Sequence, residues 1–353
     1  MPGASQQNVH CSGRAPRPVR AGRRVEYTET SLVTGASGFL GRHLVAHLLR
    51  CGVRVRACAL PWENADALAR LGAEVVRADL AVPETLPPLF AGEVDRVFHL
   101  GAICNLSTRY ARLRPVNVDG VERISALALA AGVRSFVHMS STSVYGASRG
   151  LPFTEESPRE PQDDYGRSKR DGEDIVWRRL DDGLRAVVLR PCAVYGPGCT
   201  DGAGKVFSRP TSLMAVPGEG RARISNVRVE DVSAAAHFLS LRDDAIGRAF
   251  NLADDSHPSV EEALRLAAEA FGVPAPRLHL PLPDVRAAAV VQGLAARVRG
   301  RIPDLESDAV RYLGADYVVD NARVKSAGYR FLYPDFADSM REIGRRSRDR
   351  APA

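Results

Sequence analysis

A glycine-rich octapeptide near the start of the chain limits the possible folds more than any other feature. Residues 34–41 read Thr-Gly-Ala-Ser-Gly-Phe-Leu-Gly, directly after an apolar run and directly before a helical pattern. In that context Gly35 permits a tight turn, Gly38 lets the backbone approach a pyrophosphate, and Gly41 permits close packing of helix on sheet. Unpaired N–H groups at the start of the helix would then face the phosphates. The pattern therefore predicts a dinucleotide-binding βαβ unit.

Short β-rich runs alternate with longer helical patterns from residue 31 to about residue 190. Such βαβ repetition predicts a parallel sheet with helices on both faces, and wholly apolar runs such as Ala186–Leu189 are typical of strands buried on both sides. The expected strands are Ser31–Thr34, Arg54–Leu60, Glu74–Ala78, Arg96–Leu100, Ser135–Ser140 and Arg185–Arg190, and the expected helices are Leu40–Cys51, Asn64–Leu71, Val116–Ala131 and Tyr165–Leu180.

The pattern changes after Pro191, where proline and glycine interrupt the chain repeatedly. Two further strands are expected, at Val227–Val232 and Ala249–Leu252. A helix is expected over Ser259–Phe271, because its first residues have the Ser-x-x-Glu spacing of a capping box. We infer that these later segments assemble into a second, smaller lobe.

The predicted fold class is α/β, a Rossmann-type doubly wound parallel sheet with a smaller C-terminal substrate-binding lobe. The expected boundaries are a disordered basic extension at 1–30, an NAD(P)-binding domain at 31–190 joined by later strands from about 227–252, a substrate-binding lobe made of 191–226 and 253–346, and a tail at 347–353.

Composition and charge exclude several classes of protein. Hydrophobic residues make up 45% and charged residues 25%, and no run of 18 or more uncharged apolar residues occurs, so we expect no membrane span. The net charge is +6, but part of this excess lies in the first 30 residues, which hold five arginines against two glutamates. The rest of the chain is close to balanced in charge, so we expect no nucleic-acid partner. That segment lacks the apolar core of a signal peptide, and the spacing of the cysteines leads us to expect a reduced, cytoplasmic protein. The six cysteines form no C-x-x-C pair and no zinc-type cluster with histidine, so no metal site is predicted.

Tyr165 and Lys169 begin a helical pattern, and their four-residue spacing puts both on one helix face. A neighbouring ammonium and an oxidised nicotinamide ring both favour the phenolate, so we expect the pKa of Tyr165 to lie below its usual value near 10. Tyr165 would exchange a proton with an alcohol or ketone as hydride moves to or from the nicotinamide, and Lys169 would also hold the ribose hydroxyls. Hydroxyl groups at Ser140–Ser143 follow an expected strand, at the sheet edge where ligands bind in this architecture.

The residues that would choose between NAD and NADP give no decision. The second strand ends in Cys58-Ala59-Leu60, which supplies neither an acid for a ribose 2′-hydroxyl nor a base for a 2′-phosphate. Arg56 lies nearby, on a face that the pattern does not fix. Asp79 ends the third strand, where it would accept a hydrogen bond from an adenine amino group or simply cap a helix.

Together these features resemble the extended short-chain dehydrogenase/reductase family, also called the NAD-dependent epimerase/dehydratase group. The resemblance spans about residues 31 to 335. It is carried by TGASGFLG at 34–41, ADL at 78–80, FHLGA at 98–102, NVDG at 117–120, SSTSVYG at 140–146, YGRSK at 165–169, RPCAVYGPG at 190–198 and VRVEDV at 227–232.

The resemblance implies which residues form the active site. Catalysis would rest on Ser141, Tyr165 and Lys169, with a small-molecule substrate held by the later lobe. It also implies a homodimer joined through Val116–Ala131 and Tyr165–Leu180. The implied contacts to NAD or NADP are Gly35, Ser37, Gly38, Phe39, Leu40, Gly41, Asp79, Leu80, Gly101, Ala102, Asn117, Tyr165, Lys169 and Cys192.

Departures from the family's subgroups narrow the expected reaction. Sugar-nucleotide dehydratases carry an acidic pair where this chain has Thr142 and Ser143. Sugar-nucleotide epimerases carry an asparagine at Ala193 and an arginine at Ile224, although Arg221 and Arg223 lie close enough to substitute. Losing such charge-assisted donors would weaken binding of a diphosphate. We therefore expect an NAD(P)-dependent ketone/alcohol oxidoreductase acting on a small organic or natural-product substrate. A sugar or nucleotide-sugar epimerase with tightly bound NAD, and a non-catalytic dinucleotide-binding regulator, are the alternatives.

Overall fold

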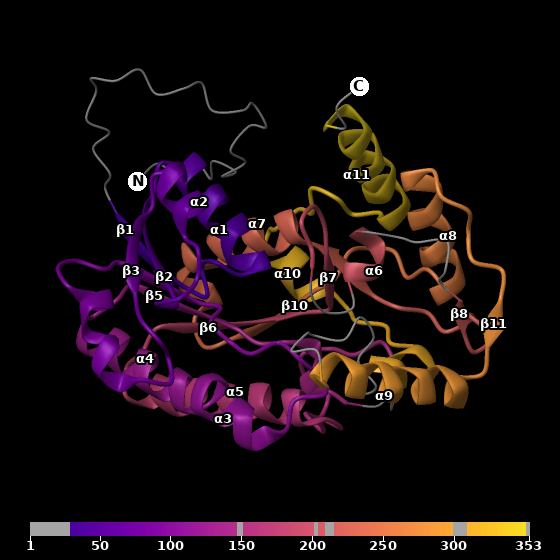
Figure 1. Cartoon of the computed structure of the whole chain (residues 1–353). Helices are drawn as coiled ribbons and strands as arrows, with labels where there is room; N and C mark the ends of the chain where they lie inside the picture. The colour runs from indigo at the N-terminus through magenta and orange to yellow at the C-terminus, as the bar shows by residue number, and fades with distance from the viewer. Residues whose placement is uncertain (1–28, 147–150, 201–203, 209–214, 299–308, 351–353) are drawn as a thin grey trace.

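A seven-stranded parallel sheet forms the centre of the protein in a computed structural model that describes residues 29–146, 151–200, 204–208, 215–298 and 309–350 (Figure 1). The chain runs outward from β1 to β3 on one side and from β4 to β10 on the other, so the order reverses between β1 and β4. This is the doubly wound arrangement, and it confirms the predicted fold class. In spatial order the strands are β10 (Ala249–Leu252), β6 (Ala186–Pro191), β5 (Ser135–Met139), β4 (Arg96–His99), β1 (Thr30–Thr34), β2 (Arg54–Ala59) and β3 (Glu74–Arg77).

Helices cover both faces of this sheet because successive strand side chains point in opposite directions. On β1, Val33 packs into one apolar cluster and Leu32 into the other, and both are fully buried. The helices packed on the Val33 side are α1 (Phe39–Arg50), α2 (Asp66–Leu71), α7 (Val229–Ser240) and α10 (Ala322–Ser326), with η3 (Thr142–Val144) and η4 (Asp243–Ala245). The Leu32 side carries α4 (Asp119–Ala130), α5 (Asp164–Asp181) and η2 (Pro87–Phe90), with α3 (Tyr110–Asn117) beside them and η1 (Pro83–Thr85) before η2.

Two of the sequence predictions were wrong in detail. The strand expected at Val227–Val232 is β9 (Asn226–Arg228) followed at once by α7, and β9 pairs with β7 (Ala193–Tyr195) rather than with the central sheet. The valines suggested a strand, but Val229 and Val232 are buried at helical spacing on α7, and acidic residues in its first turn favour the start of a helix. The helix expected at Val116–Ala131 is split into α3 and α4 at Val118.

The later segments pack around a separate apolar cluster, in which α8 and α11 face each other. The predicted helix near Ser259 is confirmed, since the Ser259 Oγ accepts a hydrogen bond from the Glu262 amide at 3.2 Å. The elements around this cluster are β8 (Val216–Pro217) paired with β11 (His279–Leu280), α6 (Lys205–Ser208), α8 (Val260–Phe271) and α11 (Phe336–Arg350). Helix α9 (Leu282–Val298) and η5 (Ala309–Leu313) pack on each other around a smaller cluster of Val285, Ala289 and Val310.

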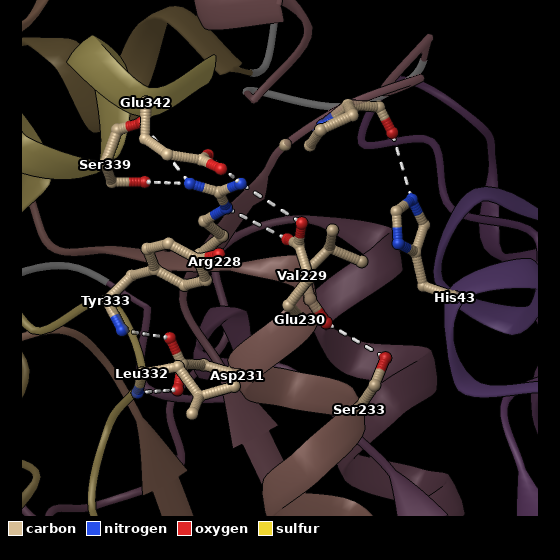
Figure 2. A network of polar contacts seen from close by, with 12 residues as sticks. His43, Arg228, Val229, Glu230, Asp231, Ser233, Leu332, Tyr333, Ser339 and Glu342 are labelled. Carbon is tan, nitrogen blue, oxygen red and sulfur yellow. Dashed lines mark hydrogen bonds and ion pairs between the residues drawn. The ribbon is translucent and has the colours of Figure 1, made fainter. Parts of the chain in front are cut away.

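A buried polar network, the Arg228 clamp, ties the C-terminal segment to the start of α7 (Figure 2). The fully buried guanidinium of Arg228 pairs with Glu230 at 3.0 Å and Glu342 at 2.6 Å, and stacks 3.6 Å from the centre of the Tyr333 ring. Next to it, the Asp231 carboxylate accepts hydrogen bonds from the amides of residues 332 and 333. Ion pairs and hydrogen bonds therefore hold together segments that lie about a hundred residues apart in the sequence.

The predicted disordered extension falls almost wholly on residues 1–28, outside the described part of the chain, and β1 already includes Thr30. At the other end α11 continues to Arg350, past the predicted tail boundary. None of the helices within the described ranges combines the length and apolarity needed to cross a bilayer.

Candidate active site

The turn after β1 has the shape that the glycine pattern predicts. Gly35 adopts a φ of +65°, and a Cβ there would lie 2.8 Å from the Cα of Gly101. A Cβ on Gly41 would collide with the carbonyl oxygen of Gly35. The first turn of α1 has no side-chain cap and no acidic residue, so its N–H groups and positive dipole remain available to an anion. The backbone cradle therefore fits a dinucleotide pyrophosphate.

The other residues predicted to bind the cofactor lie at the same edge of the sheet, because each follows the carboxyl end of a parallel strand or begins α1. Gly101 and Ala102 follow β4, and the Gly101 amide donates to Thr34 Oγ1 at 3.0 Å. Leu80 follows β3 and packs directly over Gly101. The remaining members are Ser37, Gly38, Phe39 and Leu40 around the first turn of α1, Asp79 after β3, and Cys192 after β6.

Asp79 and Asn117, which are also predicted to contact the cofactor, have protein partners. Asp79 accepts a hydrogen bond from the Ala81 amide at 2.9 Å, which fixes the turn after β3. The buried Asn117 accepts from the Ile103 amide at 2.8 Å and donates to Ser168 Oγ at 3.0 Å. Asn117 thus joins the loop after β4 to α5, and the roles of both residues toward the cofactor remain predictions.

Ser141 and Tyr165 meet at this edge although they come from different elements. Ser141 caps η3 just after β5, and its Oγ accepts from the Ser143 amide at 3.2 Å. The Tyr165 hydroxyl, in the first turn of α5, lies near the Ser141 side chain, which opposes the rise in the pKa of Tyr165 that burial causes. Gly166 makes this approach possible, since a Cβ there would lie 2.6 Å from the Ser143 carbonyl oxygen.

Lys169 lies one turn further along α5 and is buried. Its Nζ donates to the carbonyl oxygen of Met139, at the end of β5, at 2.5 Å. Burial lowers the pKa of Lys169 to about 8, so the ammonium still predominates at neutral pH. The three predicted catalytic residues therefore come together between β5 and α5.

The direction of the Tyr165 pKa shift differs from our expectation. Removal of the hydroxyl from water raises the pKa of Tyr165 well above its ordinary value, and the nearby Cys104 and Asp163 add to the increase. Without a bound cofactor, Lys169 does not lower the pKa of Tyr165 enough to offset the effect of burial. Tyr165 is consequently a neutral phenol at pH 7, which can donate a proton.

Sequence analysis missed Cys104. This exposed residue lies two positions after Ala102, and its side chain lies near the Tyr165 hydroxyl, where it adds to the rise that burial causes in the pKa of Tyr165. Its nearness also acts on the pKa of Lys169. The only signal in the sequence was its place just after the Gly101–Ala102 pair, in a loop of unpredictable path.

A second cluster of polar side chains lies away from this edge, between α1 and α7. The ligand-type atoms of His47, Cys51 and His237 all lie within 4.8 Å of one another, a grouping that sequence spacing did not predict. His47 Nε2 and His237 Nδ1 are 3.2 Å apart. Burial lowers the pKa of His47 to about 3 and that of His237 to about 4. Both rings are therefore neutral at pH 7 and share one hydrogen bond, and we assign no metal to them.

Enzymes that move hydride with a dinucleotide cofactor are built on this sheet and this glycine cradle, and the fold and site place the chain in that class. Residues 31–253 match the model of the NAD dependent epimerase/dehydratase family, and the chain belongs to that family. A nicotinamide dinucleotide is the cofactor that this membership implies, and the cradle described above fits it.

Relatives within the family differ in activity. The chain is 28% identical over 326 residues to the 4-hydroxy-2-methyl-3-oxo-4-farnesyl-3,4-dihydroquinoline-1-oxide ketoreductase of Stigmatella aurantiaca, covering 89% of this chain and 96% of the relative. It is 34% identical over 303 residues to the UDP-glucose 4-epimerase of Mycolicibacterium smegmatis, covering 78% and 94%. The UDP-glucose 4-epimerase of Thermus thermophilus, solved with NAD, superposes with a TM-score of 0.72 at 24% identity, covering 91% of this chain and all of the other.

Proposed function

We propose that this protein is an NAD(P)-dependent reductase that converts a ketone on a small apolar molecule to the secondary alcohol. The observation that carries the proposal is the close approach of the Tyr165 hydroxyl to Ser141, at the sheet edge that holds the glycine cradle. This arrangement lets two hydroxyl groups bind one carbonyl oxygen of a substrate. The reverse oxidation would use the same groups.

Each side chain has a separate task in this mechanism. Ser141 and Tyr165 donate hydrogen bonds to the carbonyl oxygen and polarise it. Tyr165, a neutral phenol because of its burial, transfers its proton to that oxygen. The Lys169 ammonium stabilises the phenolate left behind, and would hold the ribose of the cofactor. When bound, the reduced nicotinamide supplies the hydride to the carbonyl carbon.

Residues beside the site argue against elimination of water. Thr142 and Ser143 are buried hydroxyl residues, and the Thr142 carbonyl oxygen accepts a hydrogen bond from the Tyr317 hydroxyl at 2.5 Å. No carboxylate directly follows Ser141 in the chain to act as the acid or base of a dehydratase. The reductase proposal needs no such group.

The residues near Ala193 and Ile224 argue against a nucleotide diphosphate. Both side chains are apolar. Arg221 pairs with Glu219 at 3.3 Å, and Arg223 pairs with Asp316 at 3.1 Å. The two arginines that would have to replace the missing donors therefore already have acidic partners.

An apolar groove supports an apolar substrate. It is an open groove of about 690 Å³ between α9 and η5, and its lining combines apolar side chains with two arginines, Arg286 and Arg311; the apolar members are Leu282, Ala287, Val290, Val291 and Val310.

Hydrogen bonds tie this groove to the start of α5. The guanidinium of Arg311, in η5, donates to the Gln162 carbonyl oxygen at 3.1 Å, and the Tyr312 hydroxyl donates to Asp163 at 2.5 Å. Asp163 is the N-cap of the helix that carries Tyr165. The groove is therefore attached to the proposed catalytic helix, and the farnesyl group in the name of the S. aurantiaca relative is a substituent that such a groove suits.

A nucleotide-sugar epimerase is the second candidate, favoured by the 34% identity to the M. smegmatis enzyme. An epimerase returns the hydride to its substrate, so it shows no net change in reduced cofactor. A reductase consumes one reduced nicotinamide for each alcohol formed. Absorbance of the reduced cofactor, followed with a panel of apolar ketones and with UDP-glucose, separates the two.

Replacement of Tyr165 tests the mechanism. We expect Tyr165→Phe to lower kcat for ketone reduction by about 10²- to 10⁴-fold, the usual contribution of a general acid, while the Kd for NADH changes little. The matched control is Tyr110→Phe, which removes a hydroxyl bound to Asp171 on the α3–α5 pair. Full activity of Tyr165→Phe would exclude this residue as the acid.

A further inference from the structure

Helix α9 presents an apolar face to solvent on the outside of the lobe formed by the later segments (Figure 1). The helix packs on the rest of the chain through Val285 and Ala289, which are buried against Val310 of η5. On the opposite side of the helix, large apolar side chains are exposed by 47% at position 290, 66% at 291 and 57% at 294. The exposed apolar residues of this face are Ala287, Val290, Val291 and Leu294.

Helix geometry groups these four side chains into one surface. Residues spaced i, i+3, i+4 and i+7 lie on the same side of a helix, and positions 287, 290, 291 and 294 have this spacing. The solvent side of a surface helix is normally polar, so the pattern on α9 is the reverse of the usual one. A contiguous apolar surface of this kind indicates a place where something binds.

Two arginines border the apolar face. Arg286 and Arg311 line the open groove between α9 and η5, together with Val290 and Val291. Both arginines are exposed, and within the described part of the chain none of the residues that line the groove is acidic. Helix α9 contains one acid, Asp284, in its first turn, where the helix dipole stabilises a negative charge. The surface is therefore apolar with a positive border.

A second copy of the chain fits this surface poorly. In a two-fold symmetric contact each subunit offers the same patch, so Arg286 and Arg311 would approach the same arginines of the other subunit. The area is also small. A helix of 17 residues is about 25 Å long and about 10 Å wide, so its outer face covers about 250 Å². A stable interface buries about 800 Å² on each partner.

We propose that α9 holds this protein on the surface of an anionic lipid membrane. The helix lies in the plane of the membrane, with its apolar face about 5–10 Å deep at the boundary between headgroups and acyl chains. Arg286 and Arg311 then bind lipid phosphates through charge-assisted hydrogen bonds. An apolar ketone dissolved in the lipid would reach the groove without passing through water, a consequence that rests on the proposed function.

Sedimentation of the full chain with lipid vesicles tests the proposal without turnover. One set of vesicles holds equal parts of phosphatidylglycerol and phosphatidylcholine, and the other holds phosphatidylcholine alone. We expect the protein to sediment with the anionic vesicles and to partition into the neutral ones about tenfold or more weakly. Added salt should weaken binding to the anionic vesicles, because it screens the attraction between arginine and phosphate.

Variants of exposed residues separate the apolar and the charged contribution. Leu294→Glu places a charge on the apolar face, and we expect it to weaken binding to the anionic vesicles by about tenfold or more. The matched control is Leu71→Glu, which changes a similarly exposed leucine at the end of α2, far from α9 in Figure 1, and should leave binding unchanged. Arg286→Gln should weaken binding to the anionic vesicles by about fivefold and leave binding to phosphatidylcholine as it was. An unchanged Tm shows that each variant is folded.

Failure of the unmodified protein to sediment with the anionic vesicles would overturn the proposal, and so would equal losses in Leu294→Glu and Leu71→Glu. Light scattering tests the competing occupant. A molecular mass that halves in Leu294→Glu but not in Leu71→Glu would show that a second copy covers α9, which also overturns the proposal. Vesicle binding by a protein that reduces no ketone would overturn the proposed function alone.

Discussion

The ion pair between Glu173 and Arg190 offers a quantitative test of how α5 is held. Two hydrogen bonds join the carboxylate to the guanidinium at 2.9 Å and 2.7 Å, and the two side chains are 0% and 4% exposed. Glu173 lies one turn beyond Lys169 on α5, and Arg190 lies on β6. The pair therefore anchors the helix that carries the proposed catalytic residues.

Replacing Arg190 by methionine keeps much of the volume but leaves Arg159 as the cation paired with the buried Glu173. Removing one member of a buried pair typically costs about 3–5 kcal/mol, because the remaining charge loses its buried partner; here Glu173 would keep only the partly exposed Arg159. For a chain of 353 residues the entropy of unfolding is about 0.7 kcal/mol per kelvin, so we expect Arg190→Met to lower Tm by roughly 4–7 °C.

The double variant separates the pair from its surroundings. Glu173→Gln together with Arg190→Met removes both charges, so its destabilisation should be smaller than the sum of the two single variants by about 1–3 kcal/mol. The control is Arg185→Met, which breaks an exposed pair with Asp243 and should cost less than about 1 kcal/mol. Circular dichroism at fixed protein concentration gives the Tm values of the unmodified protein and of the four variants. Additivity of the two single effects within about 0.5 kcal/mol would refute the reasoning.

Two further predictions concern the active site. Because the pKa of Lys169 is about 8, kcat/KM for ketone reduction should fall as pH rises through that value; a flat profile there would show that the ammonium is not needed. The same lowered pKa means that the unfolded chain binds this proton more tightly, so the contribution of Lys169 to stability increases with pH between about 8 and its ordinary pKa. Gly41→Ala should raise the Kd for NADH by about tenfold or more, since the added methyl displaces the Gly35 carbonyl, whereas Gly293→Ala on α9 meets open space and should change nothing. Unchanged NADH binding by Gly41→Ala would contradict the cradle geometry.

Features with local causes could be predicted from the sequence. The glycine turn is fixed by a backbone conformation that Gly35 adopts easily, and the pairing of Tyr165 with Lys169 follows from helix geometry. The strand expected at Val227–Val232 failed because its valines fit a helix face as well as a strand, and tertiary packing decided between them.

Features that depend on tertiary contacts could not be predicted from the sequence. The raised pKa of Tyr165 depends on burial, which the motif does not encode. Glu63, beyond the end of β2, accepts a hydrogen bond from Ser37 of the glycine turn through a loop that Arg77 holds from another strand. Cys104 approaches Tyr165 for the same kind of reason, through a loop whose path is set by Asn117.

The Arg228 clamp has a consequence for the order in which the chain can fold. Synthesis begins at the N-terminus, and N-terminal regions generally fold first. Here Arg228 and Asp231 depend on partners that are synthesised late, among them Leu332, Tyr333 and Glu342. When all seven strands of the central sheet have emerged from the ribosome, these partners have not yet been synthesised. Arg228 and Asp231, which are buried in the folded protein, therefore still lack them. The final state is reached only after nearly the whole polypeptide has emerged.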